Sequence, residues 1–205
     1  MHVRALPRRG PLSAIDRFAR PAAPAEKCGL CGVALATEHE HLAEPATRRL
    51  LCACGPCALL FGEQASGRYR RVPPRCEALT GFQVKDGVWE QLGIPVGLAF
   101  LYRNSEVNGV VAVYPSPAGP LEASIPDEAW AAVVADNPRL GDMADDVEAL
   151  LVNRSPRGTQ LFRLSIDRCY ELIGLVRTHW AGFTGGPNLW DELDRFFSRL
   201  GSANS

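Results

Sequence analysis

The chain has 205 residues, of which 46% are hydrophobic and 22% are charged, and its formal net charge is −1. This composition is too apolar for a disordered chain and is sufficient for a packed core. The small net charge excludes a general electrostatic attraction to nucleic acid or to acidic membranes. No stretch approaches the roughly 20 consecutive apolar residues that cross a bilayer, and no apolar stretch follows Arg8 and Arg9, as an export signal would require. We therefore expect a cytoplasmic protein with no membrane span.

The sequence predicts three parts of the chain, of which the middle one is rich in cysteine. Residues 1–26 form a basic tail with several prolines, and we expect it to be flexible apart from a short helix over residues 12–18. Residues 27–75 hold five of the seven cysteines, and in a cytoplasmic protein such clustering favours metal binding over disulfides. Residues 76–205 are predicted to form an α+β domain.

Two Cys-x-x-Cys pairs carry the strongest functional signal. Cys28 and Cys31 form one pair, with glycines that permit a tight turn, and Cys54 and Cys57 form the other. Zn²⁺ accepts four thiolates at the corners of a tetrahedron, and each pair presents two of them to one ion. Four thiolates leave no open position for a water molecule, so we predict a structural rather than a catalytic zinc site.

A β-hairpin is predicted between the two cysteine pairs. Residues 39–44 and 48–52 are short extended runs on either side of a proline-containing turn at residues 45–47. The second pair leads into a helix start at residues 58–61. This order predicts a treble-clef unit, with a zinc-ribbon-like unit as the alternative, packed on the antiparallel sheet of the following domain.

Three further residues are alternative metal ligands. Cys52 and Cys54 would face the same side of an extended strand, and we prefer Cys54 because it repeats the Cys-x-x-Cys spacing. His39 and His41 could also reach the metal, although an exposed hairpin face beside several glutamates is the preferred interpretation. Iron is the alternative to Zn²⁺, because two cysteine pairs also suit a rubredoxin-like electron carrier. The position of Pro56 within the second pair favours zinc.

The α+β domain is predicted to contain two hairpins and three helices. Apolar, β-prone runs at residues 95–103 and 109–114 form the first hairpin, and residues 147–153 and 159–166 form the second. Pro126 and Pro138 bracket a predicted helix over residues 127–136. Two C-terminal helices carry apolar residues at three- and four-residue spacing, which predicts one buried stripe on each. The stripes are Cys169, Leu172, Ile173, Val176 and Trp180, and then Leu189, Trp190, Leu193, Phe196, Phe197 and Leu200.

The remaining polar clusters predict no catalytic site. Asp142, Asp145, Asp146 and Glu148 form a local acidic run without a histidine or nucleophile nearby in the sequence, and we interpret it as an exposed helix face or turn. The chain has neither a phosphate-binding glycine loop nor a G-x-S-x-G nucleophile turn. We therefore expect a protein that is not an enzyme.

A short basic segment is the candidate partner-binding surface. Arg68, Arg70 and Arg71 surround Tyr69, a combination that could contact phosphates and stack on bases. A nucleic-acid-binding regulator is therefore an alternative function, but the segment is short compared with the basic surface that such proteins present. We favour a protein partner.

Several stretches along the chain match one protein family. They are Cys-Gly-Leu-Cys, His-Glu-His-Leu, Leu-Leu-Cys-Ala-Cys-Gly-Pro-Cys-Ala-Leu-Leu-Phe, Gly-Ile-Pro-Val-Gly-Leu-Ala-Phe, Tyr-Pro-Ser-Pro-Ala-Gly, Glu-Ala-Leu-Leu-Val-Asn-Arg and Leu-Val-Arg-Thr-His-Trp. In these stretches the chain resembles a family of bacterial proteins of unknown function and of about this length, common in actinobacteria. Genes of that family tend to lie beside those for high-affinity nickel–iron hydrogenases. The resemblance covers roughly residues 15–200 and implies an accessory role in hydrogenase assembly or function, with a hydrogenase subunit or maturation factor as the partner.

Overall fold

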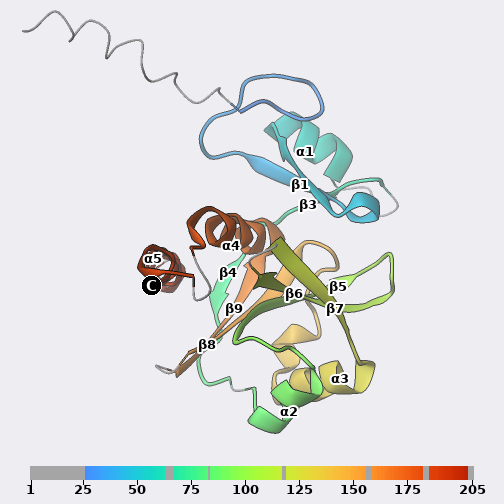
Figure 1. The fold of residues 1–205 in the computed structure, drawn as a ribbon. Coiled ribbons are helices and arrows are strands. Elements are labelled where there is room, and N and C mark those ends of the chain that lie inside the picture. Colours follow the sequence, from blue (N-terminus) through green and yellow to red (C-terminus); the bar gives the residue numbers. More distant parts are fainter. Residues whose placement is uncertain are drawn as a thin grey trace, which may run out of the picture.

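The computed structural model describes residues 26–62, 67–82, 84–116, 119–155, 158–181 and 185–202. The predicted tail, apart from Glu26, lies outside these residues, as does the predicted helix over 12–18. The described residues form a three-stranded sheet of order β2-β1-β3 and a six-stranded sheet of order β4-β9-β8-β5-β6-β7. Every strand pair in both sheets is antiparallel. The predicted α+β class is therefore confirmed (Figure 1).

The small sheet belongs to a cysteine-rich unit, residues 26–62 and 67–72. Its hairpin pairs β1 (Glu40–Glu44) with β2 (Arg49–Ala53) across a 3-10 helix at Pro45–Thr47, as the sequence predicts. Helix α1 (Gly55–Gly62) packs on β1 and on β3 (Arg70–Arg71). A Cβ atom on Gly62 would lie 2.7 Å from the Cβ of Arg71, so only glycine allows the end of α1 to approach β3 this closely.

The six-stranded sheet contains both predicted hairpins, β5–β6 and β8–β9. Strands β4 and β7 at its two edges, and helix α2 beside it, were not predicted. The central strands read as continuous apolar runs because helices cover both faces of the sheet. The strands are β4 (Cys76–Ala78), β5 (Leu98–Asn104), β6 (Gly109–Ser116), β7 (Gly119–Ile125), β8 (Glu148–Ser155) and β9 (Gly158–Ser165).

Two pairs of helices sandwich this sheet (Figure 1). On one face, α4 (Ile166–His179) and α5 (Pro187–Ser202) bury their apolar stripes in the main core, although Trp190 of the predicted stripe is exposed. On the other face, α2 (Asp86–Gln91) and α3 (Asp127–Asp136) cover a second core. None of the helices in the described ranges is long and apolar enough to cross a membrane.

The cysteine-rich unit lies against the α4 face of the larger sheet (Figure 1). Ala43 and Val72 from the unit are buried in the same apolar cluster as residues of α4 and α5. Ion pairs also cross the junction, among them Arg48 with Glu122 and Arg70 with Asp146 at 2.9 Å. The unit is therefore held in place by apolar packing and by charge.

Candidate metal centre

The first cysteine pair lies on a tight loop that is tied to β2. The Gly32 amide donates a hydrogen bond to the Cys28 carbonyl at 2.9 Å, and Gly32 has a φ of +76°, which glycine adopts without strain. The Gly29 amide donates to the Cys52 carbonyl at 2.8 Å. These bonds fix the loop beside the end of the hairpin, where the second cysteine pair begins.

The second cysteine pair lies at the start of α1. Strand β2 ends at Ala53, Cys54 follows, and the Ala58 amide donates to the Cys54 carbonyl at 2.9 Å as the first turn of the helix forms. Cys57 is one helical turn further on and is buried with Leu42 and Ala53. Loop and helix N-terminus therefore present four thiols to one point, the arrangement of a treble-clef or zinc-ribbon-like unit.

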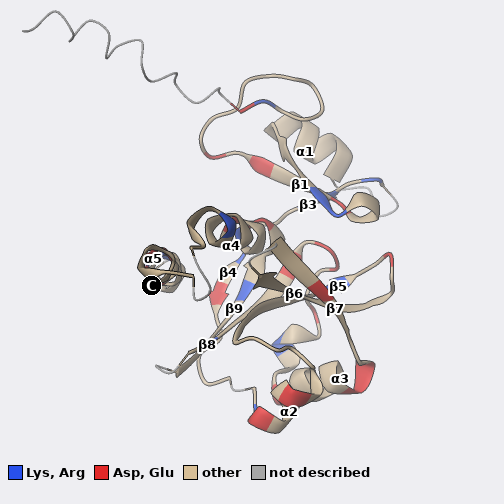
Figure 2. Cartoon of the chain, viewed as in Figure 1, with Lys and Arg blue, Asp and Glu red and all other residues tan. Residues whose placement is uncertain are grey.

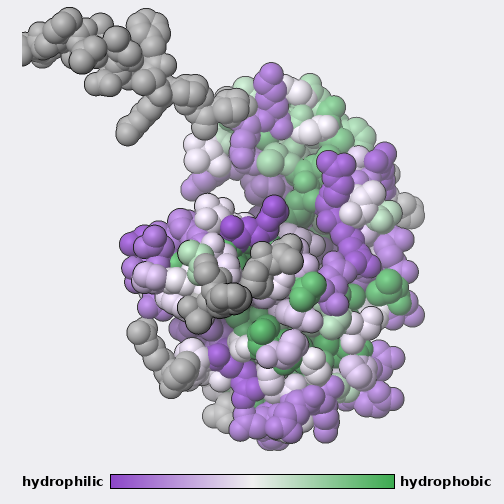
Figure 3. Space-filling model, viewed as in Figure 1, coloured by the Kyte–Doolittle hydropathy of each residue, from purple (hydrophilic) through white to green (hydrophobic). Residues whose placement is uncertain are grey.

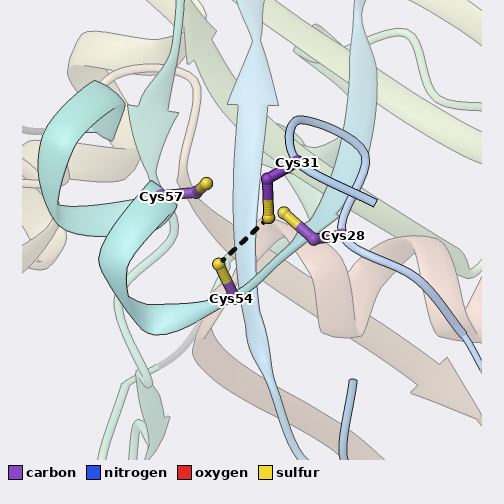
Figure 4. Close-up of side chains that lie close together, drawn as sticks. All are labelled: Cys28, Cys31, Cys54 and Cys57. Carbon is purple, nitrogen blue, oxygen red and sulfur yellow. Dashed lines mark hydrogen bonds between the residues drawn. The ribbon is translucent and has the colours of Figure 1, made fainter. Parts of the chain in front are cut away.

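The four sulfur atoms fit a tetrahedral metal ion. The Sγ atoms of Cys28, Cys31, Cys54 and Cys57 all lie within 4.8 Å of one another (Figure 4). The Sγ atoms of Cys31 and Cys54 are 3.7 Å apart. Two corners of a tetrahedron around zinc, with Zn–S bonds of about 2.3 Å, are about 3.8 Å apart. The spacing of these sulfur atoms would therefore allow the group to hold a metal ion.

The surroundings shift the pKa values of two of these thiols in opposite directions. Burial opposes ionisation of Cys28, but hydrogen bonds from the backbone of Cys31, Cys54 and Leu30 outweigh it and lower the pKa of this thiol to about 6. The pKa of the Cys57 thiol is raised to about 12, first by its hydrogen bond to Cys54 and then by burial. At neutral pH the Cys57 thiol therefore keeps its proton unless a nearby cation balances the charge of the thiolate.

The three alternative ligands lie together in a second group. His39, His41 and Cys52 bring their ligand atoms within 4.8 Å of one another. The preferred interpretation of the histidines as an exposed hairpin face is wrong: the side chain of His39 is 7% exposed and that of His41 is 29% exposed. The reason is that His41 faces Asp167 of α4, and that His39 lies beside Ala36 and Glu26 from the loop of the first cysteine pair, contacts that local sequence cannot show.

The basic segment pairs with carboxylates of its own chain. Arg68 binds Glu44, and Arg71 binds Glu40 on the neighbouring strand at 2.8 Å. Figure 2 shows the basic strand β3 beside β1, which carries acidic residues. The guanidinium group of Arg68 also lies 5.3 Å from the centre of the Tyr69 ring. A phosphate group would have to displace these carboxylates, which argues against nucleic acid at this surface.

The predicted exposure of the acidic run is wrong for two of its residues. Asp146 and Glu148 are buried, whereas Asp142 is exposed. The Nε atom of Arg163 donates to Glu148 at 3.0 Å, and Glu148 also accepts a bond from Arg75. These arginines are distant in the sequence, so the local pattern of charges could not reveal the burial.

Neither a curated protein nor a solved structure matches the chain. One family model matches residues 27–204, which is most of the chain and includes both groups of candidate ligands. The chain therefore belongs to the family of unknown function DUF5947.

Proposed function

We propose that the chain is a non-catalytic zinc protein of the cytoplasm that acts as an accessory protein through protein–protein contacts. The observation that carries this proposal is the group formed by Cys28, Cys31, Cys54 and Cys57, whose sulfur spacing suits one tetrahedral ion. Four thiolates fill the coordination shell, so the ion has no position at which to activate water. In this reading the metal stabilises the cysteine-rich unit and performs no reaction.

An exposed apolar surface on the cysteine-rich unit supports partner binding. Leu59, Leu60 and Phe61 on α1 are 51%, 66% and 44% exposed, directly after the ligand Cys57. In Figure 3, hydrophobic residues gather over the part of the unit where Figure 1 places α1. Adjacent exposed apolar side chains on a soluble domain often mark a binding surface. Zinc bound at the helix N-terminus would therefore fix the orientation of this surface.

The basic segment suits the rim of the same interface. Helix α1 packs on β3, so the arginines at residues 68–71 lie close to the apolar surface. Arginine and tyrosine are enriched at protein–protein interfaces, whereas lysine is depleted. We propose that Leu59, Leu60 and Phe61 form the centre of the contact and that Arg68 and Tyr69 border it.

The proposed partner is a subunit or maturation factor of a nickel–iron hydrogenase. Support for this identity comes from the family resemblance, and support for a protein partner comes from the surface on α1. The test is co-purification of the tagged full-length chain from a host that expresses the hydrogenase. We expect hydrogenase proteins with the wild type and their loss with Leu60→Glu. The matched control is Leu121→Glu, which changes an equally apolar residue, 47% exposed, on β7.

Two results would contradict the proposal. Absence of hydrogenase proteins from the wild-type sample would contradict the proposed identity of the partner. Their retention by Leu60→Glu would contradict the proposed binding surface. Elemental analysis of the same sample tests the metal separately. Iron in the sample, together with a visible absorption band, would favour the rubredoxin-like electron carrier over the zinc protein as the function of the chain.

A further inference from the structure

A second group of metal-binding side chains lies outside the four-cysteine group. His41 and Cys52 are cross-strand partners in the β1–β2 hairpin, so their side chains point to the same face. His39 precedes β1, and its ring centroid is 4.8 Å from that of His41. Leu42 and Ala53 on the opposite face pack with Cys28 and Cys57. The hairpin therefore separates the two groups, and this one faces α4.

Hydrogen bonds fix both imidazole rings through the same nitrogen. Nδ1 of His39 is 2.9 Å from the carbonyl oxygen of Ala36, and Nδ1 of His41 is 3.0 Å from a carboxylate oxygen of Asp167. Both oxygens are acceptors, so each Nδ1 carries a proton and donates it. In the neutral rings, Nε2 then holds the lone pair that a metal ion requires. Metal-binding histidines are usually oriented by such a carboxylate or carbonyl.

The Nε2 atom of His39 has no hydrogen-bond partner among the described residues, and it is buried. Leaving a buried polar nitrogen without a partner is unfavourable, because it has lost its hydrogen bonds to water. A carboxylate oxygen of Glu26 lies 3.5 Å from this nitrogen. Two ligand atoms on one tetrahedral zinc ion are separated by about 3.3 Å when each bond is about 2.0–2.1 Å. A cation between this nitrogen and this carboxylate would satisfy both.

We propose that His39, His41 and Cys52 form a second metal site, which binds Zn²⁺ or a closely similar divalent ion independently of the four cysteines. Both imidazoles bind through Nε2, and the thiolate of Cys52 supplies the third ligand. Two nitrogens and one sulfur form a ligand set of intermediate softness that suits zinc. The fourth position faces Glu26, whose side chain is 63% exposed and therefore lies near solvent.

The alternative is a purely structural role for these side chains. In that case His41 and Asp167 would form an ordinary ion pair, and Cys52 would be a packed thiol. The two readings differ in the number of metal ions that the chain binds. A structural role predicts one ion per chain, held by Cys28, Cys31, Cys54 and Cys57, and a second site predicts two.

Zinc titration of the metal-free full-length chain distinguishes them. The protein is kept reduced, and zinc binding is followed by competition with a chromophoric chelator. We expect two zinc ions for the wild type and one for each of Cys52→Ser and His39→Gln. The matched control is Cys76→Ser, which removes another half-buried thiol in β4 and should leave two ions bound. Circular dichroism checks that each variant is folded.

Cobalt provides a readout that does not depend on counting ions. A cobalt ion at the second site has one sulfur ligand, whereas one at the four-cysteine site has four. The thiolate-to-cobalt absorption of the second site should therefore be the weaker of the two. Cys52→Ser should remove this weaker absorption and leave that of the four-cysteine site unchanged. One zinc ion on the wild type would overturn the proposal, as would two ions on folded Cys52→Ser and His39→Gln. Loss of one ion in Cys54→Ser tests the four-cysteine centre separately.

Discussion

The Nδ1 atom of His41 on β1 lies 3.0 Å from the carboxylate of Asp167 in the first turn of α4. This contact joins the cysteine-rich unit to a helix of the larger sheet. Burial raises the pKa of Asp167, but hydrogen bonds from His41 and Ser165 outweigh it, so the net pKa is lowered and the carboxylate stays charged. A charged carboxylate on one imidazole nitrogen strengthens metal binding by the other.

The first prediction is that Asp167→Asn weakens zinc binding at the second site by about 10- to 100-fold, as expected when the partner of a metal-bound histidine is changed. The amide keeps the shape of the side chain but removes its charge. Competition titration should show weaker binding of one ion, with the other unchanged. Glu171→Gln is the control, because Glu171 lies on the same helix and pairs with Arg168 and Arg199 at the surface. Equal zinc affinities for Asp167→Asn and the wild type would contradict the prediction.

The second prediction is that a strong chelator unfolds the cysteine-rich unit and leaves the six-stranded sheet folded. Structural zinc supplies of the order of 10 kcal/mol of folding free energy, and the apolar core of the unit is small. Amide hydrogen exchange over residues 28–57 should therefore become at least about 100-fold faster, since about 3 kcal/mol already gives that factor. Mass spectrometry of peptic fragments measures this change.

Tryptophan fluorescence provides the internal control for the chelation experiment. All four tryptophans, at positions 89, 130, 180 and 190, lie outside the cysteine-rich unit. Trp89 and Trp130 are buried in the core beneath α2 and α3. Their emission should stay unchanged while exchange in the unit accelerates. A red shift of the emission in parallel with the exchange would mean that the two parts unfold together, against the prediction.

Helices and strands with a distinct local sequence pattern could be predicted from the sequence. The helix over residues 127–136 has the predicted bounds because prolines lie at both ends, and the hairpins follow from apolar runs around short turns. The edge strands β4 and β7 could not be predicted, because of their length and their exposure. β4 has only three residues, and most residues of β7 are exposed. Neither strand has the apolar periodicity by which strands are recognised.

The site residues were predictable where their spacing alone carries the chemistry. The two Cys-x-x-Cys pairs are recognisable from the sequence, and the structure brings them together. The grouping of His39 and His41 with Cys52 was missed because it depends on hairpin register and on burial against Asp167. The resemblance to a bacterial family agrees with membership of a family of unknown function. The hydrogenase context remains a prediction.

The third prediction concerns the buried ion pair of Arg163 and Glu148. Arg163 donates to Glu148 and also to the carbonyl of Arg139 at 2.8 Å, and both members of the pair are buried. Arg163→Met should lower the free energy of unfolding by about 3 kcal/mol, because it leaves a buried carboxylate without its main partner. Arg75→Met removes the other arginine, which is 44% exposed, and should cost less than about 1 kcal/mol. Urea unfolding measures the free energy of unfolding of both variants. An equal decrease for Arg163→Met and Arg75→Met would contradict the prediction.

The fourth prediction concerns alkaline pH. Burial, and then the neighbouring Tyr102 and Glu122, raise the pKa of Tyr170 to about 12, compared with about 10 in an unfolded chain. Between these values the unfolded state loses the phenol proton first, so the free energy of unfolding falls as pH rises, by at most about 1.4 kcal/mol per pH unit. Tyr170→Phe keeps the ring that packs against Phe100 and removes this proton. We expect similar stability of the two proteins at pH 7 and a shallower loss for Tyr170→Phe between pH 10 and 12, measured by urea unfolding with circular dichroism. Parallel curves over that range would show that the phenol of Tyr170 ionises equally easily in both states.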